Sequence, residues 1–122
     1  MKVQSPYEKK LMGKESNFMK KEIKIGVCKG RHEMPCDMYV FEEISDPTDV
    51  LWMKLESLRF FVNNFGDEFK KREEKIETPL KIYVTGLTVA LIEFMRFASC
   101  FFSDVTLMHY NNKTGDYYPQ QL

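Results

Sequence analysis

Two short segments of the sequence carry residues of the kind that bind phosphate. One is a basic stretch directly after an expected strand, and the other is a Thr-Gly-Leu-Thr turn directly before an expected helix. A helix N-terminus offers backbone N–H groups without partners, and a glycine there lets an anion come close. The candidate ligand-binding residues are Lys29, Gly30, Arg31, His32, Thr85, Gly86 and Thr88. The same turn is equally explained as a strand-to-helix junction with a threonine as the cap.

A second chemistry is acid–base catalysis. His32 and His109 could act as an acid–base pair in metal-independent cleavage of RNA, with Lys29 or Arg31 stabilising the charged transition state. His109 is also explained as a hydrogen-bonded residue of a strand. Neither the spacing nor the surrounding sequence brings the two histidines together, so we expect binding rather than catalysis.

A metal site is the third possibility. Its candidate ligands are Cys28, His32, Cys36 and His109. Their spacing matches no standard zinc pattern, because there is no C-x-x-C or H-x-x-x-H pair. The odd number of cysteines, three, also differs from a secreted disulfide framework, so free thiols are expected. We therefore expect no metal and no cofactor.

The elements that must position these residues alternate between strand and helix. Period-2 patterns and turn residues predict strands at 23–27, 38–41, 81–84, 105–110 and 116–118. The last two are joined by turn chemistry at 111–115 and form a hairpin. A crossover from the third strand through a helix to the fourth implies a parallel pair. If the first and third strands are central and parallel, the two phosphate-binding loops meet in one pocket.

Two long helices separate these strands. The first is expected to start near Asp46, which can cap it, with Pro47 in its first turn and Asp49 favouring the helix dipole. Its continuous apolar face comprises Leu51, Leu55, Leu58, Val62, Phe65 and Phe69, and the adjacent Trp52 is expected in the core. The second helix carries Leu87, Leu91, Phe94 or Met95, Ala98 and Phe101 on one face. The predicted fold class is α/β: a small, twisted, partly parallel sheet of four to five strands with two long helices, Rossmann-like, and a C-terminal β-hairpin.

Composition and charge limit the function classes. The 122 residues fit one domain, and 43% are hydrophobic. We expect residues 1–21 to be a basic, flexible leader and 22–122 to form a single α/β domain. The net charge is zero, but residues 1–24 carry seven Lys and three Glu, a local balance of +4. This arm could contact a phosphate backbone or an acidic protein, or be a solvated tail. A neutral total disfavours a dedicated nucleic-acid binder.

No apolar run approaches the roughly 20 residues of a membrane span, so we expect a cytoplasmic protein with no membrane partner. Aromatic residues near the C-terminus, Tyr110, Tyr117 and Tyr118, could stack on a base or hold a partner subunit. Cross-strand pairing within the hairpin accounts for them equally well.

Three segments together resemble a group of small, mostly uncharacterised proteins of bacteria and their phages. They are Gly30–Pro35 with Tyr39–Asp49, Tyr83–Thr88, and His109–Gln120, within a resemblance that covers residues 23–121. The layout also looks like the small Rossmann-like proteins of CRISPR and other antiphage systems that bind cyclic oligonucleotides. In those proteins the phosphates contact the loop after the first strand and a helix N-terminus. By position, this resemblance implies Lys29, Arg31, His32, Thr85, Gly86 and Thr88.

The leading hypothesis is therefore a phosphate- or nucleotide-recognising binding protein of a phage–host conflict system, acting as a homodimer that captures a nucleotide-type signal. One alternative is an inhibitor of the anti-defence or anti-CRISPR type that binds a protein partner through its surface. A further alternative is a metal-independent ribonuclease.

Overall fold

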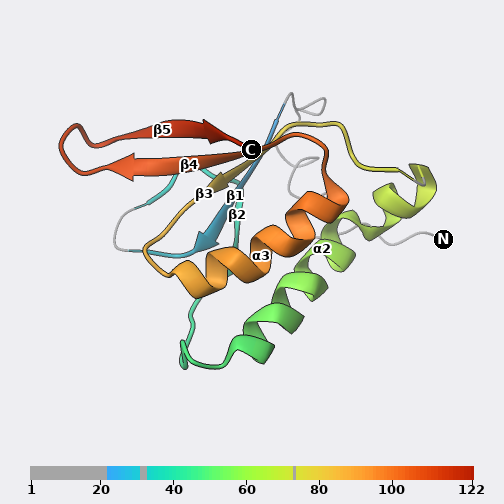
Figure 1. Cartoon of the computed structure of the whole chain (residues 1–122), viewed down its shortest axis with the longest axis horizontal. Helices are drawn as coiled ribbons and strands as arrows, with labels where there is room; N and C mark the ends of the chain where they lie inside the picture. Colours follow the sequence, from blue (N-terminus) through green and yellow to red (C-terminus); the bar gives the residue numbers. More distant parts are fainter. Residues whose placement is uncertain (1–21, 31–32, 73) are drawn as a thin grey trace.

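The protein is a two-layer α/β structure built on one five-stranded sheet (Figure 1). The computed structural model describes residues 22–30, 33–72 and 74–122, so the expected leader at 1–21 lies outside the described residues. Along the chain, the elements are β1 (Ile23–Cys28), β2 (Met38–Phe41), α2 (Val50–Arg72), β3 (Leu80–Tyr83), α3 (Thr88–Phe101), β4 (Val105–Asn111) and β5 (Asp116–Gln121). This arrangement confirms the predicted α/β class and the C-terminal hairpin.

The sheet has the order β2-β1-β3-β4-β5, with β1 and β3 near its centre. β1 is parallel to both β2 and β3, and β3 is parallel to β4, so the predicted parallel crossover is confirmed. β5 is antiparallel to β4 and closes the hairpin through a turn in which Gly115 N–H donates to the carbonyl of Asn111 at 2.8 Å. Gly115 has a φ of +79°, a conformation that glycine adopts without strain. The carboxyl ends of four strands therefore share one edge of the sheet.

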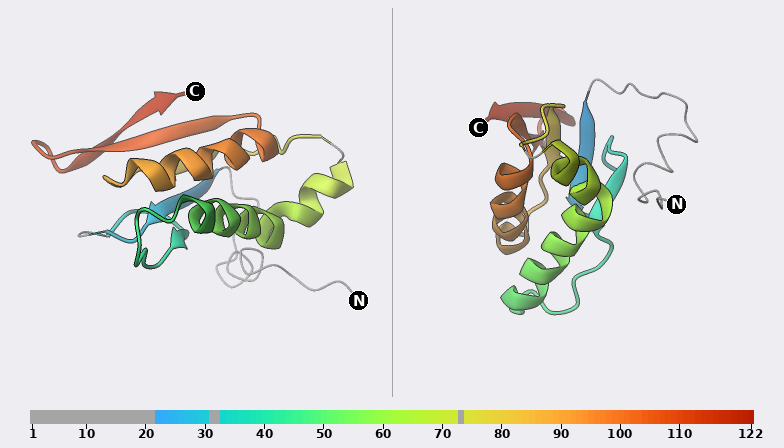
Figure 2. Two further views of the ribbon diagram at one scale, coloured as in Figure 1. Left: turned by 60° about the horizontal axis from the view of Figure 1, so that its bottom comes forward. Right: turned by 90° about the vertical axis from the view of Figure 1, so that its right-hand side faces the viewer.

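Both helices pack on the same face of the sheet (Figures 1 and 2). Ile25, Ile82 and Leu107 point from three neighbouring strands into the main core beneath these helices. On the opposite face, Met34, Tyr83 and Met108 form a second, smaller cluster, which contains no helical residue within the described part of the chain. The segment between β1 and β2 supplies Met34, so this loop covers the face that the helices leave open.

Phenylalanine side chains hold α2 against α3. The ring of Phe61, which is fully buried, stacks on Phe94 with centroids 4.6 Å apart and on Phe101 with centroids 5.3 Å apart. Phe65 meets Phe102 edge to face at 5.2 Å. Offset and edge-to-face contacts are the favoured geometries of aromatic pairs, so this cluster fixes the two helices on the sheet.

The start of α2 differs from the prediction. The helix begins at Val50, and the cap is Asp49, whose Oδ1 accepts a hydrogen bond from the N–H of Trp52 at 3.0 Å. Asp46 instead accepts bonds from the N–H and hydroxyl of Thr48, at 3.0 and 2.6 Å. Asp46 thus closes a turn before the helix, because its side chain bonds to the backbone two residues ahead.

Only part of the apolar face predicted for α2 enters the core. Leu51, Leu55, Leu58 and Val62 are exposed, while the core receives Met53, Phe61 and Phe65. Trp52, which was expected in the core, is 37% exposed and contacts Phe41 with centroids 5.5 Å apart. The helix is apolar on two faces, and helical periodicity alone does not show which of the two meets the sheet.

Ser57 is a polar residue on the buried side of α2. Its side chain is fully buried, and its Oγ has no hydrogen-bond partner among the described residues.

A buried hydroxyl without a partner costs about 1–3 kcal/mol, and alanine is the better helix former. We expect Ser57→Ala to raise the free energy of unfolding by about 1 kcal/mol in urea titrations. A loss of stability on this substitution would show that the hydroxyl is satisfied in solution. Ser99→Ala, at an exposed position whose hydroxyl bonds to Met95 O, is the matched control and should change little.

No helix in the described ranges combines the length and the apolar character that a transmembrane span requires.

Candidate functional site

The loop after β1 and the turn after β3 lie side by side at the carboxyl edge of the sheet. β1 and β3 are neighbours in parallel register, with Gly26 opposite Tyr83. A methyl group placed on Gly30 would be 3.9 Å from Cγ2 of Thr85, which is ordinary van der Waals contact. The structure therefore brings Gly30 and Thr85 together as predicted. Arg31 and His32, from the same loop, lie outside the described residues.

The N-terminus of α3 has no side-chain cap within the described part of the chain. Its N-cap residue is Leu87, and neither Thr85 nor Thr88 bonds to the first turn. The explanation of the Thr-Gly-Leu-Thr turn as a threonine-capped junction is therefore wrong. The backbone N–H groups of the first turn have no intrahelical acceptor, and the helix dipole places partial positive charge there. Such an end favours an anion.

Thr85 carries a buried hydroxyl beside this helix end. Its Oγ1 is shielded from solvent yet has no hydrogen-bond partner among the residues that the structure describes. Threonine hydroxyls can donate one hydrogen bond and accept two, so an oxygen of a ligand would satisfy it. Gly86 is exposed, and a methyl group built on it would meet no described atom within 4 Å. The approach to the helix end is consequently open.

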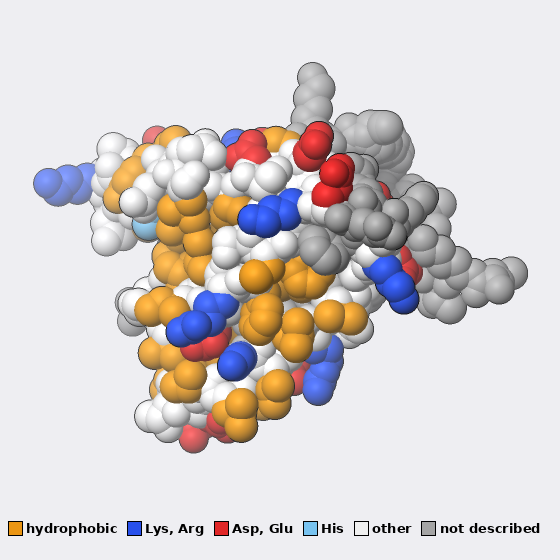
Figure 3. Space-filling model, turned by 45° about the vertical axis from the view of Figure 1, so that its right-hand side comes forward, with side chains coloured by type: hydrophobic (Ala, Val, Ile, Leu, Met, Phe, Trp, Pro, Cys, Tyr) orange, Lys and Arg blue, Asp and Glu red, His pale blue; other side chains and the backbone are white. Residues whose placement is uncertain are grey.

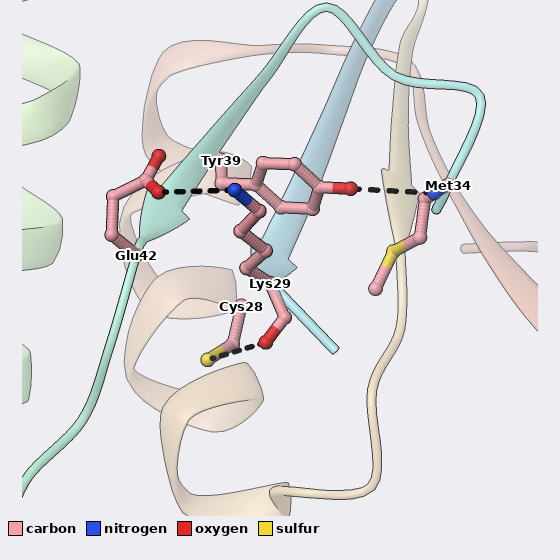
Figure 4. Close-up of polar contacts among 5 residues, drawn as sticks. All are labelled: Cys28, Lys29, Met34, Tyr39 and Glu42. Carbon is pink, nitrogen blue, oxygen red and sulfur yellow. Dashed lines mark hydrogen bonds and ion pairs between the residues drawn. The ribbon is translucent and has the colours of Figure 1, made fainter. Parts of the chain in front are cut away.

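Lys29 does not join this group. Its Nζ lies 3.8 Å from a carboxylate oxygen of Glu42, which follows β2. Figure 4 shows the lysine extending toward β2, and β1 separates β2 from β3 in the sheet. Lys29 thus takes part in a solvent-exposed ion pair, which contributes little to stability, and its contact with a ligand stays a prediction. Thr88, the first residue of α3, is exposed at the helix end itself.

Tyr39 holds the loop between β1 and β2 in place. Its ring lies over Gly26, where a methyl group would be only 2.7 Å from two ring carbons. Its hydroxyl oxygen accepts a hydrogen bond from the N–H of Met34 at 3.3 Å (Figure 4). Burial raises the pKa of the Tyr39 hydroxyl above its ordinary value. The contacts of Tyr39 with Gly26 and Met34 were not predicted from the sequence, although a glycine inside a strand is a signal that another group approaches the backbone closely.

Three of the four residues considered for metal binding, Cys28, Cys36 and His109, lie within the described residues. Within the described ranges, no three His, Cys, Asp or Glu side chains gather in a group that could hold a metal ion. Cys28 contacts the carbonyl of Lys29 at 3.7 Å (Figure 4), and burial, with the nearby Glu42 charge, raises the pKa of its thiol. Cys28 packs against the main core, whereas Cys36 packs against the second cluster and lies next to Gly26. His32 is outside the described residues.

His109 is bonded within the hairpin. Its Nε2 lies 2.7 Å from Oε1 of Gln120 on β5, and its ring lies against Tyr118 with centroids 5.4 Å apart. These contacts favour the interpretation of His109 as a hydrogen-bonded strand residue. An acid–base pair with His32 stays a prediction.

The C-terminal tyrosines form cross-strand pairs, as the hairpin interpretation predicted. Tyr110 and Tyr117 are directly opposite and their centroids are 5.3 Å apart, while Tyr117 also meets Tyr83 at 5.0 Å. Near the tip of the hairpin is an open hollow of about 490 Å³, which the sequence did not predict; it is lined by Tyr110, Asn111, Asn112, Lys113 and Tyr118.

Among the described residues, the carboxyl edge thus presents a helix end without a side-chain cap, a buried hydroxyl without a partner and an open glycine within one turn. No protein-family model, curated protein or solved structure gives a significant match to this chain. The chemistry of the site must accordingly be inferred from its own residues. They are suited to binding an oxyanion.

Proposed function

We propose that the protein binds a phosphate-bearing ligand of the nucleotide type at the carboxyl edge of β1 and β3. The observation that supports this most is the combination of two features of the described residues: α3 begins without a side-chain cap, and Oγ1 of Thr85 has no hydrogen-bond partner. Both are groups for which a phosphate oxygen would supply the missing partner. The neighbouring Gly30 and Gly86 leave room for the ligand.

The role proposed for this binding is capture of a nucleotide-type signal, in a homodimer of a phage–host conflict system. The support is the resemblance of the layout to small antiphage proteins in which phosphates contact the corresponding loops. Arg31 and His32, which belong to the same segment as Gly30, are the side chains expected to add charge and contacts to the ligand.

The test is isothermal titration calorimetry of the full chain with inorganic phosphate, linear nucleotides and cyclic oligonucleotides. We expect Gly86→Phe to weaken binding at least tenfold, because the new ring fills the approach to the helix end. The free energy of unfolding should change by no more than about 0.5 kcal/mol, since a side chain at Gly86 meets open space. Cys100→Phe introduces the same ring at an exposed position near the other end of α3 and is the matched control.

A second variant separates binding from folding. Thr85→Val keeps the shape of the side chain and removes the unpaired hydroxyl, so it should leave stability unchanged or higher and weaken binding about tenfold. The proposal fails if none of the compounds binds. It also fails if both variants bind as tightly as the wild type.

A further inference from the structure

A row of apolar side chains runs along the outer face of α2. Leu51, Leu55, Leu58 and Val62 are 64%, 48%, 37% and 51% exposed. They follow one another at steps of four, three and four residues, which places them on a single stripe of the helix. Figure 3 shows apolar side chains gathered over the helical face of the molecule, with a few lysine and arginine side chains among them. We call these four residues the α2 stripe.

The α2 stripe is not needed for the core. Met53 and Phe61, at other positions around the same helix, and Phe65, one turn beyond Val62, already bury the contacts with the sheet and with α3. With the adjacent Val50 and Trp52, the stripe exposes on the order of 500 Å² of apolar surface, close to the largest patch that a typical monomer shows. Patches of this size are often functional. A standard interface buries roughly 800 Å² on each partner, so this patch could form the centre of one.

The spacing of the stripe is complementary to itself. Steps of four, three and four are the same in both directions, and they match the a and d positions of a coiled-coil seam. A two-fold axis between Leu55 and Leu58 would place each of these residues opposite the other in a second copy. The same axis would place Leu51 opposite Val62. An interface of this kind uses one patch on both subunits, as two-fold dimers do.

The flanking charges favour the antiparallel arrangement. With Leu55 at an a position and Leu58 at a d position, Lys54 occupies the g position and Arg59 the e position beside the seam. In a parallel pair, Lys54 would therefore face Arg59 of the second copy, and the two positive charges would repel each other. In the antiparallel pair, Arg59 lies on the same flank as Trp52 of the second copy. Arg59 is exposed and already bonded to Glu56 at 2.6 Å, so its charge is partly balanced, and its guanidinium can rest on the indole ring.

We propose that the protein forms a two-fold dimer in which the α2 stripe packs antiparallel against the α2 stripe of a second copy. The proposal defines the surface and the direction of the pairing, and it does not depend on ligand binding. The carboxyl edge of β3 takes no part in it, so dimerisation and nucleotide binding can each fail without the other.

The test begins with sedimentation equilibrium of the full chain over a hundredfold range of concentration. We expect a mass twice the 14.5 kDa of one chain, and a single-chain mass for Leu55→Glu. Leu122→Glu changes a residue of similar exposure at the end of the hairpin and should stay dimeric. Circular dichroism of each variant checks the fold, which the substitution of an exposed leucine should preserve.

The antiparallel direction of the helix pairing is tested by mixing two variants that are each expected to be monomeric, Leu55→Glu and Leu58→Lys. Positions 55 and 58 oppose each other only in the antiparallel pair, so the mixture should form a heterodimer held by a glutamate–lysine contact. A mixture that stays monomeric overturns the antiparallel arrangement. A wild-type chain that is monomeric throughout, or a Leu55→Glu chain that is still dimeric, overturns the proposal and assigns the stripe to a different protein partner or to none.

Discussion

Phe61→Ala is expected to lower the free energy of unfolding by about 3–5 kcal/mol, the usual cost of truncating a buried phenylalanine. Phe61 has no exposed surface, and its ring stacks on both Phe94 and Phe101. Truncation would leave a cavity at the centre of the contact between the helices, where neighbouring rings relax little. A domain of this size is stable by only about 5–15 kcal/mol, so the effect is large.

Urea titrations followed by circular dichroism measure this loss. Protein concentration must be held fixed, because the proposed dimerisation would add to the apparent stability. Phe61→Leu fills most of the same volume and should cost less than about 1.5 kcal/mol. If Phe61→Ala loses no more than Phe61→Leu does, the stacked cluster does not hold α2 on α3.

Gly26→Ala should destabilise the protein by about 2 kcal/mol, although alanine in place of a strand glycine normally helps. The new methyl group would lie 2.7 Å from Cδ1 and Cε1 of Tyr39 and 3.0 Å from Sγ of Cys36. Tyr39 cannot turn aside freely, because its hydroxyl is bonded to the N–H of Met34. The clash must be relieved by moving the strand or the loop.

The matched control is Gly30→Ala, whose methyl group meets its nearest described neighbours at 3.8 and 3.9 Å and should be tolerated. A double-mutant cycle with Tyr39→Ala isolates the cause. In the Tyr39→Ala background, Gly26→Ala should cost little, giving a coupling energy of about 1–2 kcal/mol. Equal costs in both backgrounds would contradict the close approach of the ring to the glycine.

Much of the fold was predictable because its strands are short and clearly bounded. Alternation at Ile23, Ile25 and Val27 and turn residues around Gly115 each act locally, so the sequence shows them directly. Which face of α2 meets the sheet was not predictable. The exposed set Leu51, Leu55, Leu58 and Val62 and the buried pair Met53 and Phe61 are both apolar, and only packing against the sheet and α3 distinguishes them.

The candidate site was predicted in part for the same reason. The nearness of Gly30 and Thr85 follows from a parallel pairing of β1 and β3, which the pattern of elements implies. The direction of Lys29 depends on Glu42 at the end of another strand, and this long-range contact has no local signal. The sequence likewise does not show that the Thr85 hydroxyl lacks a partner among the described residues, because this depends on which groups the fold places around it.

The outer edge of β5 has a consequence for assembly. The N–H of Leu122 donates to the carbonyl of Val105, so along β5 the even-numbered residues direct their backbone nitrogens toward β4 and the odd-numbered ones away from it. Pro119, opposite Met108, is one of the outward positions, and proline has no N–H to offer. An incoming strand would find a missing donor in the middle of that edge, so the sheet resists growth into fibrils on this side.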